Sequence, residues 1–204
     1  WGNASAIDRK KGVLYIKPSG VDYSTMKEAD IVQVNLKTGD STGPFKPSSD
    51  TPTHLHLYRK FPEIGGIVHT HSAWATSWAQ ACREIPCLGT THADHFYGSV
   101  PLTRALTKEE IEGEYELNTG ILIAEHFRGR KILEQPGALV SEHGPFCWGR
   151  NIQEAVNHAI ILEEIAKMAF RTVMLGKDEP VQQALLEKHY SRKHGPDAYY
   201  GQKQ

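Results

Sequence analysis

Two histidines separated by one residue, His69 and His71, come directly after an apolar segment that has the character of a buried strand. Side chains at positions i and i+2 of an extended chain point to the same side, so both imidazoles can reach one metal ion. A third histidine, His143, ends another apolar segment, and Asp50 could add a carboxylate. Three imidazoles leave positions on Zn²⁺ open for substrate oxygens, as a catalytic zinc site requires. The spacing predicts a metal centre, and histidines that only pack and hydrogen-bond are the alternative.

Histidine is the one residue type in excess, with 11 of 204 residues. Imidazole is both a common metal ligand and an acid/base group near neutral pH, which makes the placement of these residues informative. Most of the others lack a comparable pairing, and we expect them to be surface, capping or packing residues. These are His54, His56, His92, His95, His126, His158 and His194.

Two segments, residues 17–20 and 46–50, repeat the order Lys-Pro-Ser. Each offers a cation, hydroxyls and turn amides, and the second lies at a predicted helix N-terminus, which suits a phosphate dianion. Proline and serine are also ordinary turn residues, so spacing alone favours plain turns over a phosphate site.

Two further segments carry groups that can move protons. Asp94 ends a polar cluster that begins at Gly89, and it can act as a general acid/base or as a helix cap. On residue type alone, the cap is favoured. Tyr199 and Tyr200 lie in the C-terminal tail, where a phenol can pack the tail down or, near a metal, transfer a proton.

Charge and hydropathy limit the partners of the chain. The 23 basic and 24 acidic residues nearly cancel, which argues against a general polyanion binder. Residues 188–194 mix basic and aromatic side chains, but one short cluster is more typical of a solvated helix face than of a nucleic-acid site. No run of 18 apolar residues and no signal-peptide pattern occurs. Three cysteines without CxxC spacing fit reduced thiols, so we expect a cytoplasmic protein. Charge and hydropathy together predict no nucleic-acid partner and no membrane partner.

Short strands and helices must position these groups. Apolar segments bounded by Gly, Pro or Asp predict strands at residues 13–16, 31–34, 67–68 and 138–140. Cap residues, a capping box at 107–110 and apolar residues at three- and four-residue steps predict helices at 53–61, 72–82, from 107, 118–127, 152–175 and 181–194. Alternating strands and helices without a linker predict one α/β domain over residues 1–204, with a tail at 197–204.

Several segments together have a more specific pattern than any motif alone. They are WGN at 1–3, IKPSGV at 16–21, KPSSDTPTH at 46–54, GGIVHTH at 65–71, GTTHAD at 89–94, HGPF at 143–146, RKHG at 192–195 and AYYGQ at 198–202. They resemble the class II aldolase/adducin family, and within it the pentulose-phosphate epimerases. The resemblance covers essentially the whole chain.

This resemblance implies a three-layer α/β/α sandwich with a mostly antiparallel central sheet, assembled as a homotetramer with active sites at subunit interfaces. It makes His69, His71 and His143 zinc ligands and Asp50 the carboxylate at the metal, with Mn²⁺ or Co²⁺ as substitutes. The positions that match substrate-phosphate contacts are Gly2, Asn3, Lys17, Ser19, Gly20, Ser48 and Ser49.

The resemblance also overturns the cap interpretation of Asp94. Asp94 and Tyr200 match an acid/base pair that a neighbouring subunit supplies, and Glu116 and His189 fall near that site.

The sequence departs from the family pattern at two places. The family has a helical segment before residue 1 that is absent here, and His95 stands where the epimerases carry tyrosine.

The implied activity is interconversion of L-ribulose 5-phosphate and D-xylulose 5-phosphate. C4 of a ribulose phosphate is not adjacent to the carbonyl, so simple deprotonation cannot invert it, whereas retro-aldol cleavage of C3–C4, rotation of the aldehyde and re-addition can. Arabinose and ascorbate catabolism would present the same pentulose phosphate. The alternatives are an aldolase that releases its fragments, and a non-catalytic adducin-like assembly module, which need not keep metal ligands.

Overall fold

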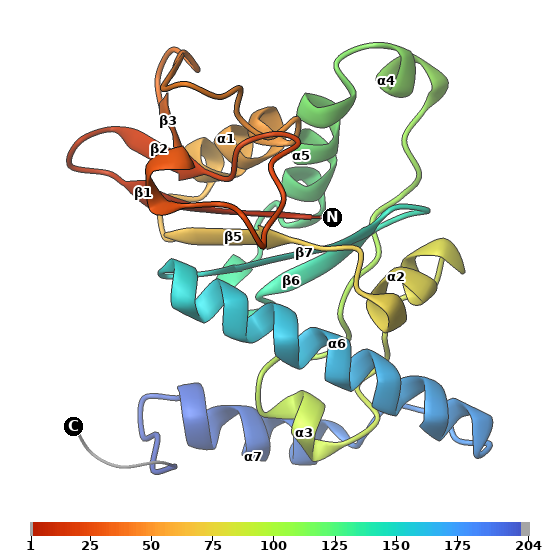
Figure 1. Ribbon diagram of the computed structural model, residues 1–204. Helices are drawn as coiled ribbons and strands as arrows, with labels where there is room; N and C mark the ends of the chain where they lie inside the picture. Colours follow the sequence, from red (N-terminus) through yellow and green to blue (C-terminus); the bar gives the residue numbers. More distant parts are fainter. Residues whose placement is uncertain (1, 201–204) are drawn as a thin grey trace.

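The computed structural model describes residues 2–200. Residue 1, the first residue of the WGN segment, lies outside the described residues. Residues 201–204, which include the last two residues of the AYYGQ segment, also lie outside them. The chain folds around a central sheet whose strands have the order β4-β3-β2-β1-β5-β7-β6 (Figure 1). Every neighbouring pair in that sheet is antiparallel.

The strands and helices alternate irregularly along the chain. The strands are β1 (Asn3–Asp8), β2 (Val13–Ile16), β3 (Val32–Asn35), β4 (Ser41–Thr42), β5 (Gly66–His69), β6 (Gly137–Val140) and β7 (Gly144–Gly149). The α-helices are α1 (Thr51–Lys60), α2 (Ala73–Gln80), α3 (Thr90–Ala93), α4 (Lys108–Glu112), α5 (Tyr115–His126), α6 (Ile152–Met174) and α7 (Gln183–His194). Two short 3₁₀ helices are η1 (Glu28–Asp30) and η2 (Ile132–Glu134).

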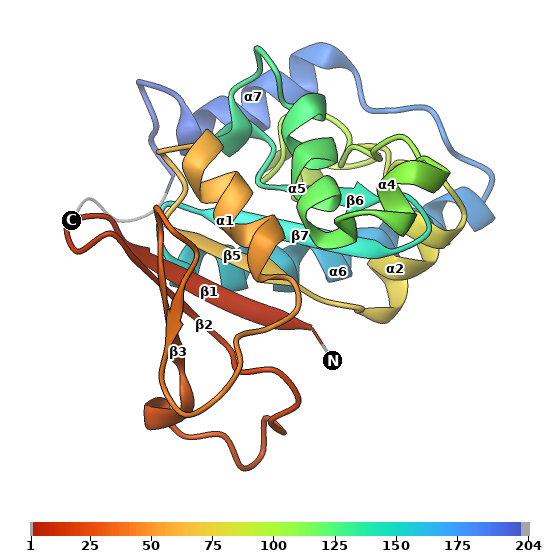
Figure 2. The same cartoon turned by 90° about the horizontal axis from the view of Figure 1, so that it is seen from above.

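Helices cover both faces of the sheet (Figures 1 and 2). Helices α1 and α5 lie on one face, while α2 and α6 lie on the other. Two hydrophobic clusters correspond to these two interfaces, and β6 and β7 are buried along their whole length between them. Helices α3 and α7 pack together beyond α6. The predicted three-layer α/β/α fold with an antiparallel sheet is therefore confirmed.

The helices were easier to predict than the strands. All six predicted helices are present, with ends shifted by a few residues. The largest shift is in α5, which begins at Tyr115 because the side chain of Asn118, the predicted cap, donates instead to the carbonyl of Glu110. The predicted capping box is present, since Thr107 and Glu110 exchange side-chain to backbone hydrogen bonds.

Three strands were not predicted: β1, β4 and β7. The sequence of β1 is NASAID, mostly small and polar, and β7 contains Gly and Pro. They form strands because long-range pairing satisfies their backbone groups, as β1 joins β2 to β5 and β7 joins β5 to β6. Among the described residues, no helix is both long and apolar enough to span a bilayer.

Glycines bring the start of α6 against the sheet. A Cβ on Gly66 would overlap the backbone of Asn151 and Ile152, and one on Gly149 would overlap Glu154. Asn151 caps α6 by accepting a hydrogen bond from the amide of Glu154. The close approach fixes α6 beneath β5, the strand that ends in His69.

A Gly66→Ala substitution should therefore destabilise the fold. The added methyl must displace helix backbone, and overpacking of this kind costs about 1–3 kcal/mol or more. Gly89→Ala is the matched control, because a Cβ there meets no atom within 4 Å. Urea unfolding of both variants checks this, and equal stabilities would contradict the close packing of α6 on the sheet.

Candidate active site

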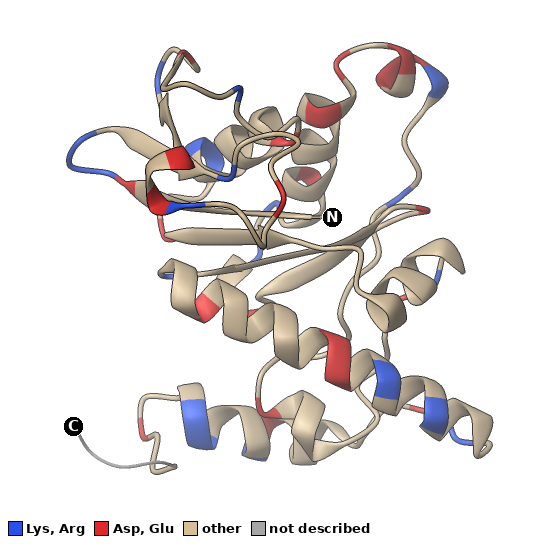
Figure 3. Cartoon of the chain, in the orientation of Figure 1, with Lys and Arg blue, Asp and Glu red and all other residues tan. Residues whose placement is uncertain are grey.

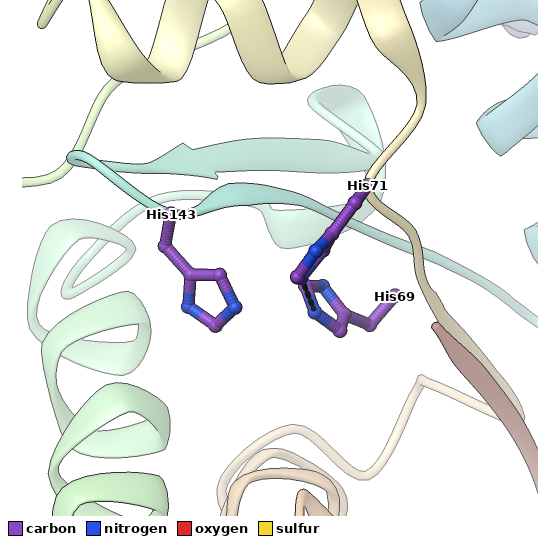
Figure 4. Close-up of side chains that lie close together, drawn as sticks. All are labelled: His69, His71 and His143. Atoms are coloured by element: carbon purple, nitrogen blue, oxygen red, sulfur yellow. Dashed lines mark hydrogen bonds between the residues drawn. The ribbon is translucent and has the colours of Figure 1, made fainter. Parts of the chain in front are cut away.

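Three histidines from two neighbouring segments meet at one end of the central strands (Figure 4). His69 is the last residue of β5, His71 follows two residues later, and His143 lies in the turn between β6 and β7. The Nε2 atoms of His69 and His71 are 3.0 Å apart, and one ligand atom from each of the three residues lies within 4.8 Å of the others. The predicted convergence is thus present, and metal binding by these residues stays a prediction.

Hydrogen bonds orient two of the rings. Nδ1 of His69 lies 2.9 Å from the carbonyl oxygen of Pro145, so Nδ1 carries the proton, and Nε2 faces the cluster as an acceptor beside His71 Nε2. Phe146 stacks on the His69 ring with centroids 4.1 Å apart. Nδ1 of His143 lies 3.3 Å from the hydroxyl of Tyr115. The rings are held in the way that metal-binding histidines are usually held.

The surroundings lower the pKa of two of these imidazoles, His69 and His143. Burial, together with the neighbouring His143 and His71, lowers the pKa of His69 to about 3. Burial and His71 also lower the pKa of His143. Neutral imidazoles offer lone pairs to a cation, and Asp50 Oδ2 lies 3.9 Å from His69 Nε2. Three nitrogens and one carboxylate could hold a divalent metal ion.

The two Lys-Pro-Ser turns lie side by side. Pro18 and Pro47 form an antiparallel bridge, the amide of Ser19 donates to the carbonyl of Lys46 (2.9 Å), and the amide of Ser48 donates to that of Lys17 (3.0 Å). Each turn thus fixes the other through its backbone. This pairing joins two segments that are almost thirty residues apart in the sequence.

The turns and the histidines line one cavity of about 610 Å³. Every predicted metal and phosphate residue lines it: Gly2, Asn3, Lys17, Ser19, Gly20, Ser48, Ser49, Asp50, His69, His71 and His143. Glu116 lines it too, and so do Tyr23 and Tyr115, which the sequence did not single out. Of the two lysines, only Lys17 is among the lining residues.

Lys17 and Gly2, which line this cavity, both contact Tyr23. The ammonium of Lys17 donates to the carbonyl of Val21 (2.7 Å) and lies 4.7 Å from the centre of the Tyr23 ring. The Tyr23 hydroxyl donates to the carbonyl of Gly2 (2.7 Å). Gly2 has φ +102°, and a Cβ there would lie 2.6 Å from the carbonyl oxygen of His69, so only glycine fits. The side-chain amide of Asn3 donates to Asp50, one of the candidate metal ligands.

Asp94 lies elsewhere in the chain, at the end of α3. Its carboxylate accepts hydrogen bonds from Arg192 (2.8 and 2.9 Å to Nη2) and from His189 (3.0 Å), and Lys193 lies 3.5 Å away. Burial opposes ionisation, yet the hydrogen bonds from Arg192 and His189 outweigh it and lower the pKa of Asp94. Asp94 is the C-cap residue of α3 rather than an N-cap, and three side chains of α7 pair with it instead of being simply solvated.

Tyr200 belongs to the same cluster as Asp94. Its ring lies against the guanidinium of Arg192 (4.9 Å) and the ammonium of Lys193 (4.6 Å), and its amide donates to the carbonyl of Arg192. Neither Asp94 nor Tyr200 lines the cavity of the three histidines. In Figure 1, α6 lies between the α3–α7 layer and the sheet. Within one chain the predicted site is therefore divided into two clusters.

The remaining histidines mostly serve packing, as expected. His54 and His92 are buried, His158 contacts the carbonyl of Trp148 (2.7 Å), and His194 contacts that of Asp94 (2.9 Å). His54 Nδ1 lies 2.7 Å from the hydroxyl of Ser5, which also contacts the hydroxyl of Tyr58. All three cysteines are free, in agreement with the expectation of reduced thiols.

Comparison with known proteins defines the family. Residues 1–170 match the Class II Aldolase and Adducin N-terminal domain, and the chain belongs to this family. It is similar in structure to an L-fuculose 1-phosphate aldolase, with 26% identity, a TM-score of 0.78 and coverage of 94% of this chain and 84% of that one.

Two further solved structures are similar. YgbL from Escherichia coli shares 25% identity with a TM-score of 0.69, covering 92% of this chain and 86% of that one. A sugar-phosphate aldolase from Thermotoga maritima shares 21% identity with a TM-score of 0.66, covering 87% of this chain and 88% of that one, which shows the shared fold. Helix α7 and Tyr200 lie after the matched residues 1–170.

Buried histidines should make stability depend on pH. Burial lowers the pKa of His54 and of His69 to about 3, well below the ordinary 6.5, so the unfolded chain binds more protons than the folded chain below pH 6.5. Each of the two should then cost about 1.4 kcal/mol of unfolding free energy per pH unit as the pH falls from 6.5 toward 3.

Urea unfolding of the metal-free protein at a series of pH values tests this. His54→Gln should flatten the decline, and His56→Gln, at a half-exposed position on the same helix, should change it less. A wild-type stability that stays constant from about pH 7 to about pH 5 would contradict the buried neutral state of these rings.

Proposed function

We propose that this protein is a zinc-dependent L-ribulose-5-phosphate 4-epimerase. The observation that carries the proposal is one cavity that three converging histidines and Asp50 share with two paired Lys-Pro-Ser turns. A donor set for a divalent metal and a set of amides, hydroxyls and a lysine suited to a phosphate thus share one space. The sequence segments that resemble the pentulose-phosphate epimerases contribute most of its lining.

Two groups of cavity residues would bind the two ends of the substrate. The turns around Ser19 and Ser48 would hold the phosphate through amide and hydroxyl groups, with Lys17 adding positive charge. His69, His71 and His143, with Asp50, would hold the metal, which when bound supplies a Lewis acid for the substrate oxygens and for charge released by C3–C4 cleavage. The anchored phosphate keeps the aldehyde fragment in place while its carbonyl turns.

Asp94 and Tyr200 are the proposed acid/base pair. Asp94 is held as a carboxylate, and Tyr200 is held beside it by Arg192 and Lys193. One of the two would remove the proton of the C4 hydroxyl, and the other would serve the epimeric hydroxyl on the return. Since neither lines the histidine cavity of its own chain, they would act on the cavity of a neighbouring subunit in a homotetramer.

A fragment-releasing aldolase is the second candidate. The similarity to an L-fuculose 1-phosphate aldolase favours it, because both reactions share the cleavage of a bond beside a metal-bound ketose end. The two differ in whether the fragments recombine before they leave. A non-catalytic assembly module accounts less well for the convergence of three histidines in one cavity.

The product of L-ribulose 5-phosphate decides between these functions. Zinc-loaded protein should form D-xylulose 5-phosphate, chelator-treated protein should be inactive, and added zinc should restore turnover. His126→Gln, at the end of α5 and outside the cavity lining, is a control that should leave turnover unchanged. Dihydroxyacetone and glycolaldehyde phosphate without xylulose 5-phosphate would identify an aldolase instead, and turnover that survives complete metal removal would reject the metal-dependent mechanism.

Mixing two inactive variants tests the shared site. Asp94→Asn and His71→Gln should each lower turnover by about 100-fold or more. In randomly mixed tetramers, a site with its histidines from one chain and Asp94 from the next is intact about one time in four, so about one quarter of the wild-type activity should return. Mixing that restores no activity, despite exchange of subunits shown by mass spectrometry, would place both clusters of a working site in the same chain.

A further inference from the structure

Tyr115 joins the cavity to the helix layer and has no role in the mechanism above. It is the first residue of α5, is half-buried, and lines the cavity together with the three histidines. Its hydroxyl lies 3.3 Å from Nδ1 of His143, and the two ring centroids are 6.2 Å apart with planes inclined by 31°.

The start of α5 holds Tyr115 firmly. The side chain of Thr53 in α1 donates to the carbonyl of Glu116, and the side chain of Thr119 donates to the carbonyl of Tyr115 itself (2.9 Å). Gly120 lets α5 lie directly on α1, since a Cβ there would lie 3.0 Å from the carbonyl oxygen of Thr53. The same helix α1 follows directly after Asp50. Tyr115 and Asp50 are thus placed by one pair of packed helices.

The protons at Tyr115 can be assigned. In Figure 4 one ring nitrogen of His143 faces the other two histidines, which leaves Nδ1, the nitrogen beside Tyr115, to carry the proton. Nδ1–H then donates to the tyrosine oxygen. Among the described residues, the Tyr115 hydroxyl makes this one side-chain hydrogen bond, so its own proton is left to point into the cavity.

We propose that Tyr115 is both a positioning residue for His143 and a hydrogen-bond donor to an oxygen of the sugar phosphate. It accepts from the back of one metal-ligand ring and donates to the carbonyl or hydroxyl oxygen of the substrate held in front of the metal ligands. This inference rests on the proposed binding of a metal and a phosphorylated sugar in this cavity.

A single-atom change tests the inference. Tyr115→Phe removes the hydroxyl and keeps the ring, and Tyr15→Phe, on β2 and outside the cavity lining, is the matched control. The first measurement is the Co²⁺ dissociation constant without substrate, by competition with a chelator. The second is kcat and KM for L-ribulose 5-phosphate at saturating metal.

Tyr115→Phe should weaken Co²⁺ binding by about 10-fold and, with the metal site filled, lower kcat/KM by at least a similar factor. Tyr15→Phe should leave both values unchanged. A Co²⁺ dissociation constant and a kcat/KM that both stay within about 2-fold of wild type would overturn the inference.

The two proposals fail in different ways. If wild-type protein does not convert L-ribulose 5-phosphate, the epimerase proposal fails. The Co²⁺ dissociation constant still tests whether Tyr115 positions His143 for metal binding. Nitrogen NMR of zinc-loaded wild-type protein labelled with ¹⁵N-histidine adds a test that needs no variant. His143 should coordinate through Nε2 with a proton on Nδ1, and coordination through Nδ1 would overturn the inference.

Discussion

The antiparallel pairing of β5 with β7 is the constraint on which the candidate site depends. It places His69 opposite Phe146 in the register, so the end of one strand lies beside the turn that leads into the other. His71 continues from the first strand and His143 precedes the second. Gly144 is part of this arrangement, because a Cβ there would lie 3.0 Å from the carbonyl oxygen of Thr70. Backbone hydrogen bonds, rather than side-chain contacts, bring the three imidazoles together.

A second backbone pairing builds the other end of the cavity. The bridge between Pro18 and Pro47 connects the chain after β2 to the chain before α1. In the proposed function, the polar groups of these turns would bind the phosphate without a basic surface, which agrees with the near balance of 23 basic and 24 acidic residues. Charges of both signs are spread over the outer helices and loops in Figure 3. A dianion would be met by oriented amides and one fixed lysine, whose effect is confined to the cavity.

How far the sequence predicts this structure depends on the range of the interactions. Local signals sufficed for the helices, because caps and apolar periodicity are encoded within a few residues. They failed for β1 and β7, whose strand character comes from partners distant in sequence. The spacing of His69 and His71 predicted their convergence correctly, because in extended backbone the side chains at i and i+2 point the same way. The sequence did not predict Tyr115 as a site residue, because its place beside His143 depends on tertiary packing. Only the contacts of α5 with α1 and with the β6–β7 turn bring the two residues together. The pairing of Asp94 with Arg192, across nearly one hundred residues, was equally beyond local reasoning.

The separation of the two clusters gives the basic residues of α7 a specific purpose. Without partners, a carboxylate at the end of α3 would keep an ordinary pKa. Instead, Arg192 donates hydrogen bonds to both oxygens of Asp94, and His189 donates to one of them. The same Arg192 and the adjacent Lys193 support the Tyr200 ring. If Asp94 and Tyr200 are the proton-transfer groups, as proposed, a substrate must be brought to them. Within one chain, the Lys-Pro-Ser turns and the three histidines lie on the other side of α6. Packing the α3–α7 layer of one subunit over the cavity of another would supply that substrate. It would also shield the cavity from water, which strengthens the hydrogen bonds within it.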